Sequence, residues 1–191
     1  MASDPNAADL EKQRKEKRRN NFLRVGIVIL VVAITVLILL YRDKISQIGA
    51  YGYPGIFVLS IFANATVIFP VPGVLITTVM GTVFNPFWVA VAAGSGAALG
   101  ETSGYLLGFS GQAVIPDTPR YKRLVEWMKK YGDITILVLA AIPNPAFDVA
   151  GMISGALKMP YFRFLLFTCL GKILKMLVFA YTGSTLIRLF P

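Results

Sequence analysis

Three ionisable residues lie inside long apolar stretches of this sequence. Glu101 is flanked by glycines, alanines and a leucine, and Lys172 and Lys175 lie in the apolar run that follows Pro160. A charge at the centre of a membrane helix costs about 2.5–3.5 kcal/mol, so these side chains are expected to face the protein interior or water. One hypothesis is that these residues line a polar track that passes a headgroup through the hydrocarbon core. A lysine would bind the phosphate of the headgroup, and Glu101 would bind a cationic group. The other is a structural ion pair between Glu101 and a lysine, and the residue types leave both open.

Two more polar candidates, Asn144 and Asp148, lie at a break with the sequence Pro143-Asn144-Pro145. They are candidates for the same track, and the alternative is that they cap the helix after the break. The chain has no histidine and a single cysteine, Cys169. The lack of histidine excludes imidazole catalysis and His-ligated metals, and a single cysteine excludes an internal disulfide. We therefore predict that the protein is not an enzyme and has no metal site or cofactor.

A weak internal repeat supplies the segments that must position these residues. The break at 143–145 has a counterpart 73 residues earlier, Pro70-Val71-Pro72-Gly73. Beyond the breaks the correspondence continues at an offset of 74 residues, which pairs Gly81 with Gly155, Pro86 with Pro160 and Glu101 with Lys175. Corresponding Pro-interrupted hydrophobic segments are typical of transporter-type sites near the bilayer midplane. Pro70, Pro72, Gly73, Pro143 and Pro145 are therefore expected to form two helix breaks.

The composition indicates an integral membrane protein that crosses the bilayer several times. Of 191 residues, 55% are hydrophobic and 15% are charged, and the mean hydropathy is +0.65. Soluble domains carry about 25% charged residues. Between Tyr53 and Gln112, Glu101 is the only charged residue.

The expected organisation follows the chain in order. Residues 1–21 form a basic cytoplasmic tail, and residues 22–41 form an N-terminal transmembrane anchor. Residues 50–184 form a membrane domain with repeat one at 54–109, an amphipathic linker at 110–133 and repeat two at 134–184. The arm at 74–84 has 11 residues, which covers about half of a ~30 Å hydrocarbon core. Each Pro-x-Pro segment is therefore predicted to be a re-entrant helical hairpin, which must pack in protein or face a water-filled cavity.

Two helices carry patterns of their own. The helix predicted at 86–109 has glycines spaced by four, which let another helix approach closely: Gly96, Gly100, Gly104 and Gly108. Within the linker, Thr118 and Pro119 predict a helix start. Apolar residues then recur at helical spacing between basic ones, which indicates a helix on the membrane surface. The alternative is a helix packed against another part of the protein.

The basic residues predict the orientation. With the N-terminus in the cytoplasm, most Lys and Arg residues fall on the inner side, as the positive-inside rule requires. They include the basic residues of the linker at 110–133, together with Lys158 and Arg163. The two repeats then have opposite orientations in the membrane. The predicted fold is an all-α integral membrane protein, an inverted repeat with two opposed re-entrant helical hairpins plus transmembrane helices.

These motifs resemble a known family. The helix motif Gly100-Glu101-x-x-Gly104-Tyr105-x-x-Gly108 and both hairpins resemble the DedA / VTT-domain superfamily, also called the SNARE-associated Golgi protein superfamily, over roughly residues 50–184. The segment at 141–151 is similar to the vacuole membrane protein 1 branch. The resemblance implies movement of phospholipids or lipid-linked phosphates between bilayer leaflets, as in a scramblase or flippase. Many DedA proteins have an acid where this chain has Val74, and an arginine near Leu139-Ala140-Ala141, so these departures favour passive movement.

Two alternatives to lipid movement come from other classes: an ion- or proton-coupled small-solute transporter, and a non-transporting membrane assembly or homeostasis factor. Charge pairing closed to water would favour the assembly factor, and a hydrophilic groove open to lipid would favour lipid movement. Membrane lipids are the expected partners and nucleic acid is not, while a homo-oligomer is left open. The expected location is an integral membrane one with a cytoplasmic N-terminus, in the plasma membrane if the source is prokaryotic.

Overall fold

The computed structural model describes residues 49–65, 73–111, 118–144 and 146–189, together with isolated positions between residues 26 and 47. The chain divides into two compact units, residues 1–40 and 41–191. In the first unit the described positions, from Gly26 to Leu40, are helical. The predicted basic tail at 1–21 and most of the predicted anchor at 22–41 lie outside the described residues.

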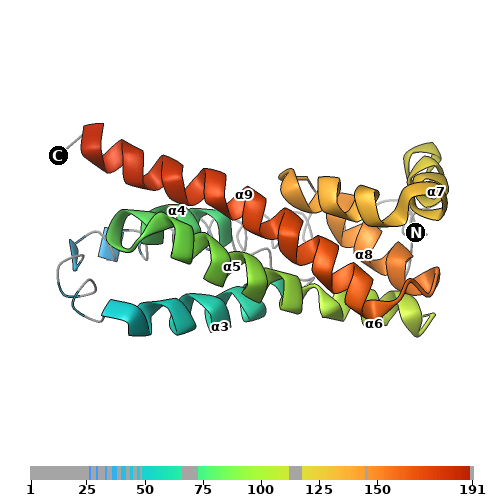
Figure 1. The fold of residues 1–191 in the computed structure, drawn as a ribbon, viewed down its shortest axis with the longest axis horizontal. Coiled ribbons are helices and arrows are strands. Elements are labelled where there is room, and N and C mark those ends of the chain that lie inside the picture. The colour runs from blue at the N-terminus through green and yellow to red at the C-terminus, as the bar shows by residue number, and fades with distance from the viewer. Residues whose placement is uncertain are drawn as a thin grey trace, which may run out of the picture. The chain divides into compact units, whose positions relative to one another are not determined.

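In the described ranges of the second unit every regular element is helical (Figure 1). After a short 3-10 turn, η1 (Gly49–Tyr51), come α3 (Gly52–Ala65), α4 (Gly73–Val83), α5 (Pro86–Gly100), α6 (Thr102–Phe109), α7 (Pro119–Ala141), α8 (Ala146–Ala156) and α9 (Tyr161–Leu189). The predicted starts are confirmed at α5 and α7, where Pro86 and Pro119 occupy the first turn. Asn85 caps α5, because its side chain accepts the Phe87 N–H at 3.0 Å.

Helical arms flank both Pro-x-Pro breaks. α3 and α4 lie on either side of the first break, and α7 and α8 on either side of the second. The helices that follow the breaks have 11 residues each, or roughly 16 Å, so neither crosses a ~30 Å hydrocarbon core alone. Gly73 begins α4, and Pro143 lies in the turn after α7, whereas Pro70, Pro72 and Pro145 lie outside the described residues. The helical arms are confirmed, and their re-entry from opposite membrane faces stays a prediction.

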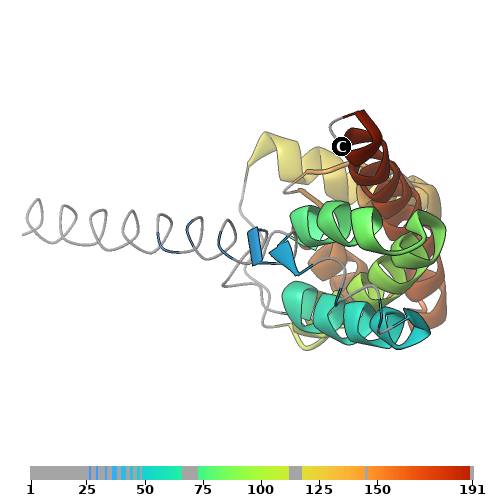
Figure 2. The same cartoon turned by 90° about the vertical axis from the view of Figure 1, so that its left-hand side faces the viewer.

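The packing of the helices follows the internal repeat. α3 packs on α5 in the first repeat, and α7 packs on α9 in the second. The second arms cross over, so that α4 packs on α9 and α8 packs on α6 (Figures 1 and 2). A Cβ added to Gly81 would collide with the backbone of Ala180, and one added to Gly155 would collide with the backbone of Tyr105. At the offset of 74 residues, Gly81 corresponds to Gly155, and Ala180 corresponds to the position next to Tyr105. The two repeats therefore interlock through equivalent contacts.

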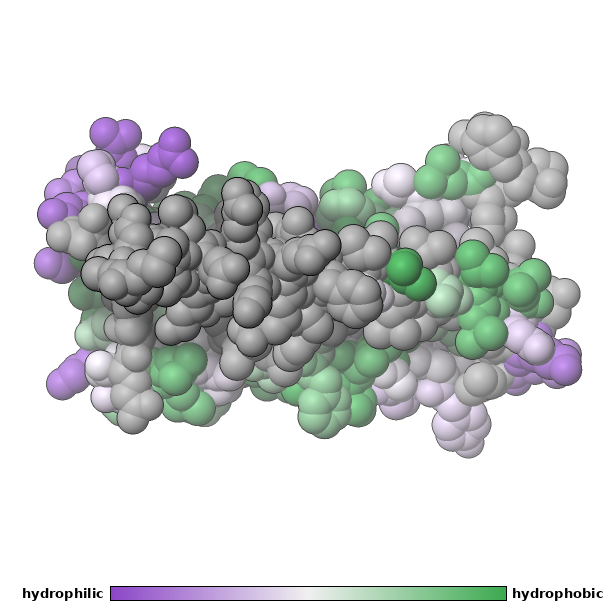
Figure 3. Space-filling model, turned by 180° about the vertical axis from the view of Figure 1, so that it is seen from behind, coloured by the Kyte–Doolittle hydropathy of each residue, from purple (hydrophilic) through white to green (hydrophobic). Residues whose placement is uncertain are grey.

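From Leu166 to Val178, the exposed side of α9 is apolar and its buried side carries polar residues. The segment Tyr161–Leu186 is long and apolar enough to cross a membrane, and it is the one such helix among the described residues. Its exposed apolar residues up to Val178 recur every fourth position: Phe162, Leu166, Leu170, Leu174 and Val178. Thr168 and Lys172 lie on the buried side. In Figure 3 hydrophobic residues likewise dominate the coloured area between the ends of the visible face, while hydrophilic ones gather toward the two ends, most densely at the upper left, where α7 lies. This polarity is typical of a membrane protein.

Helix α7 joins the predicted linker helix to the first arm of the second hairpin. It bends at Tyr131, whose backbone is not helical (φ −136°, ψ 42°). The Thr135 hydroxyl donates to the Tyr131 carbonyl at 2.9 Å and so satisfies an acceptor at the bend. In the first half of α7, Leu124 and Met128 are buried in a core cluster that includes Phe164 of α9. Protein therefore covers the apolar stripe, as in the alternative of a packed helix, and contact with the membrane surface stays a prediction.

Candidate functional site

The long helix predicted at 86–109 is divided at its single acidic residue. α5 ends at Gly100 and α6 begins at Thr102, with Glu101 at the junction (φ −65°, ψ −11°). The backbone bonds continue across it, because the Glu101 N–H donates to the Ala97 carbonyl at 3.1 Å. The Ser103 hydroxyl donates to the Gly100 carbonyl at 3.1 Å and to the Ala65 carbonyl at 3.0 Å. These bonds join the end of α3 to the junction and fix the position of the acid.

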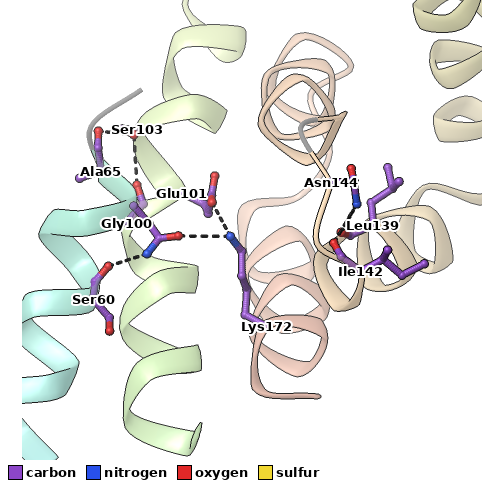
Figure 4. A network of polar contacts seen from close by, with 10 residues as sticks. Ser60, Ala65, Gly100, Glu101, Ser103, Leu139, Ile142, Asn144 and Lys172 are labelled. Atoms are coloured by element: carbon purple, nitrogen blue, oxygen red, sulfur yellow. Dashed lines mark hydrogen bonds and ion pairs between the residues drawn. The ribbon is translucent and has the colours of Figure 1, made fainter. Parts of the chain in front are cut away.

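Glu101 forms an ion pair with Lys172 of α9. The Lys172 Nζ donates to the Glu101 Oε1 at 2.5 Å, and the two residues are 4% and 7% exposed (Figure 4). The side chains meet because α5 and α9 approach closely: a Cβ added to Gly94 would lie 2.7 Å from the Ile173 backbone. The internal repeat had placed Lys175 opposite Glu101. The observed pair uses Lys172 instead, about one helical turn earlier.

Two further groups surround the Lys172 ammonium. The Asn64 Oδ1 accepts from Lys172 at 3.3 Å, and the Asn64 amide is oriented by a bond from its Nδ2 to the Ser60 carbonyl at 2.9 Å. The Phe147 ring lies on another side, with its centroid 4.5 Å from the Nζ, which is within the range of a cation–π interaction. Asn64 lies near the end of α3, and Phe147 lies in the first turn of α8. The pair therefore lies where the residues beside both breaks come together.

Lys175 and Asp148 belong to the surroundings of this pair. Lys175 is half-buried on α9, and Asp148 is exposed in the first turn of α8. Both interact electrostatically with Glu101. An acid in the first helical turn is also favoured by the helix dipole. The structure thus groups four of the predicted candidates, two acids and two lysines, around the junction of α5 and α6.

Asn144 lies apart from the pair, at the end of α7 (Figure 4). Its Nδ2 donates to the Leu139 carbonyl at 2.9 Å and to the Ile142 carbonyl at 2.8 Å. The expected capping role is therefore present at the helix before the break rather than the helix after it. The Asn144 Oδ1 is buried and has no hydrogen-bond partner among the described residues.

Two site residues were not predicted, Asn64 and Phe147. Asn64 could have been predicted from the sequence, because it is the one residue with an amide side chain in residues 54–69. A polar group in a membrane arm is expected to face protein. Phe147 could not have been predicted as a site residue, because an aromatic residue in apolar sequence is usually part of the core.

Comparisons with known proteins identify a family. A family model described as VTT domain matches residues 71–185, a range that includes both members of the ion pair. Vacuole membrane protein KMS2 of Arabidopsis thaliana is 37% identical over 57 residues, which is 28% of this chain and 14% of that protein. Vacuole membrane protein KMS1 of the same plant is 39% identical over 54 residues, 26% of this chain and 13% of that protein. The matched segments thus span about one seventh of these relatives, and no solved structure gives a significant match.

Proposed function

This chain belongs to the VTT domain family, and on that premise we propose that it moves phospholipids or lipid-linked phosphates from one bilayer leaflet to the other. The observation that carries the proposal is the buried pair of Glu101 and Lys172 between the residues beside the two breaks. A charged pair in helices of this apolarity is expensive to bury. A role in passing charged headgroups through the hydrocarbon core would explain why the chain retains a buried pair with this free-energy cost.

The chemistry of a phospholipid headgroup fits an exchange with this pair. The phosphate of the headgroup would replace the Glu101 carboxylate on the Lys172 ammonium. A cationic group of the same headgroup would then take the carboxylate. One internal ion pair becomes two external ones, so no buried charge is left uncompensated during the exchange. For a lipid-linked phosphate without a cationic group, Lys175 supplies a second positive charge close by.

The exchange requires α5 and α9 to separate, because the pair is closed in this structure. The apolar exposed face of α9 can remain in contact with acyl chains while the headgroup passes along its polar face. Nothing in this scheme consumes energy, so the movement is passive, in either direction. The N-terminus is proposed to be cytoplasmic, with the two hairpins entering from opposite faces of an organelle or plasma membrane.

A specific observation also favours a second candidate, a non-transporting membrane assembly factor. Glu101 and Lys172 are more than nine-tenths buried, and charge pairing closed to water is what a purely structural role requires. In that case the pair would hold the two repeats together and contact no headgroup. The two candidates differ in whether removing the charges alters lipid movement in a protein that is still folded.

The test is reconstitution of the purified protein in phosphatidylcholine vesicles that contain a fluorescent phospholipid. Dithionite added outside quenches the outer leaflet, and further quenching reports movement from the inner leaflet. Wild-type protein should quench beyond the outer-leaflet fraction, and Glu101→Gln should slow this phase. Glu126→Gln, the same chemical change on the exposed face of α7, is the matched control and should match wild type. Quenching limited to the outer leaflet with folded wild-type protein would refute lipid movement and favour the assembly factor.

A further inference from the structure

A cavity lies at the bend of α7, away from the ion pair. Its volume is about 560 Å³, and it is lined by α7 residues on both sides of Tyr131, by the end of α8 and by the start of α9. This volume is in the range of small-molecule sites in proteins. Arg163 on its wall precedes Lys172 by nine residues in α9, about 13 Å along the helix. The cavity is therefore a separate feature from the buried pair.

The polar lining of the cavity is mostly basic. Lys129, Lys130 and Arg163 contribute positive charge, and Asp133 is the one acid in the lining. Asp133 is neutralised by an ion pair with Arg163. The lysines are exposed, and Lys130 lies over the Tyr131 ring at 5.0 Å from its centroid. The cavity thus keeps an excess of positive charge after its internal pair is counted.

A strained lysine adds a fourth basic residue beside the cavity. Lys158 lies between two lining residues, Leu157 and Met159, and has a left-handed backbone with φ 54°. It occupies the position after α8 where glycine is usual, since its N–H bonds to the Gly155 carbonyl and the Met159 N–H bonds to the Ser154 carbonyl. A side chain there costs about 1–2 kcal/mol. Residues kept in such conformations often serve a function.

Apolar groups next to the charges indicate a lipid and not a soluble anion. Ile134 on the cavity wall is 62% exposed, and Trp127, one residue before the lining begins, is 56% exposed. Tryptophan is enriched where a membrane protein meets the headgroup layer. Basic pockets between membrane helices are suited to anionic headgroups. Lysine and arginine together also match the charge and geometry of a phosphate.

We propose that this cavity binds the headgroup of an anionic phospholipid that ends in a phosphate monoester. The terminal phosphate lies between Lys129, Lys130 and Arg163, and the glycerol and upper acyl chain lie against Ile134 and Met159. This site holds a lipid at the membrane surface whether or not the protein moves lipids between leaflets. All the basic residues of the cavity belong to segments expected on the cytoplasmic side, so the lipid comes from the cytoplasmic leaflet.

The test measures binding to the full chain purified in detergent. Microscale thermophoresis titrations use dioctanoyl phosphatidic acid, dioctanoyl phosphatidylcholine and inorganic phosphate. The double variant Lys129→Gln/Lys130→Gln removes two exposed charges from the cavity. Gly132→Trp adds bulk without charge at a lining position where a Cβ meets no atom within 4 Å. The matched control, Arg120→Gln/Arg123→Gln, removes two exposed charges from the same helix at a different cavity.

Wild-type protein should bind phosphatidic acid saturably and more tightly than the other two ligands. Lys129→Gln/Lys130→Gln should weaken this binding roughly 25-fold, at about fivefold for each basic residue. Gly132→Trp should weaken it as well, and the control should stay near wild type. Equal losses in the control and the lysine variant would mean general surface attraction and overturn the proposal. Inorganic phosphate bound as tightly as phosphatidic acid would show a soluble occupant, and wild-type affinity in both cavity variants would also refute the site.

Discussion

Replacing Lys172 by methionine removes the ammonium that contacts Glu101 at 2.5 Å and leaves a buried carboxylate behind. Replacing Glu101 by glutamine leaves the ammonium behind, but with partial compensation. The Asn64 Oδ1 and the Phe147 ring still face the Lys172 Nζ, and the new amide oxygen can accept a hydrogen bond. We therefore expect both variants to destabilise the fold, with the larger effect for Lys172→Met.

The size of the stability loss follows from the balance between the Coulomb attraction within the pair and the cost of desolvating its two charges. At an effective dielectric constant of about 20, unit charges 2.5 Å apart attract by about 7 kcal/mol. Desolvation costs several kcal/mol for each ion, so the net contribution of the intact pair is small. Loss of one partner costs about 3–5 kcal/mol, because the other charge stays buried and uncompensated. Glu101→Gln should lie near the lower end of this range and Lys172→Met near the upper end.

A double-mutant cycle measures the coupling directly. The variant Glu101→Gln/Lys172→Met has no buried charge left and should be more stable than Lys172→Met alone. The coupling free energy should be about 3 kcal/mol or more, the upper end of values for contacting residues. The assay is SDS-induced unfolding in detergent, followed by the fluorescence of Trp88 and Trp127. A control cycle of Lys172→Met with Glu126→Gln should be additive within about 0.5 kcal/mol. Additivity in the first cycle would refute the pairing.

Three further predictions concern the glycines, a strained turn and the topology. Gly100→Ala should destabilise the fold by about 1–3 kcal/mol in the same unfolding assay, because its Cβ would lie 2.5 Å from the Ile61 carbonyl oxygen; Gly104→Ala, whose nearest neighbour would be 3.9 Å away, should not. Lys158→Gly should raise stability by about 1 kcal/mol, since glycine adopts positive φ without a steric cost, and an unchanged or lower melting temperature would contradict this. Lys129→Cys should react with an impermeant thiol reagent only from the cytoplasmic side, and labelling from the opposite side alone would invert the proposed topology.

Local sequence rules predicted most of the helical elements. Pro86 and Pro119 begin helices because the missing N–H is not needed in the first turn. The glycine spacing predicted close helix approach, and the structure shows that Gly96 and Gly100 face the backbone of α3 whereas Gly108 faces α8. The same row of glycines thus packs against two different helices. The spacing of the glycines could not predict this, because it identifies one face of a helix but not the helices that pack on that face.

The pairing within the site depended on tertiary geometry. The repeat offset placed Lys175 opposite Glu101, but an offset fixes equivalence between positions and not contact between them. The crossing of α5 and α9 brings Gly94 against the Ile173 backbone, which makes Lys172 the residue that reaches the acid. The role of Asn64 depends on the same packing, because it is defined by where α3 ends relative to α9.

A role of the ion pair in lipid movement is tested most directly with the doubly neutral variant, Glu101→Gln/Lys172→Met. This variant is expected to fold, since it has no uncompensated charge, so its activity separates the stability of the pair from its function. In vesicles with fluorescent phospholipid, dithionite should quench little beyond the outer leaflet for this variant and clearly beyond it for wild type. Wild-type rates of quenching in the folded double variant would refute a role of the ion pair in lipid movement and leave it with a structural role alone.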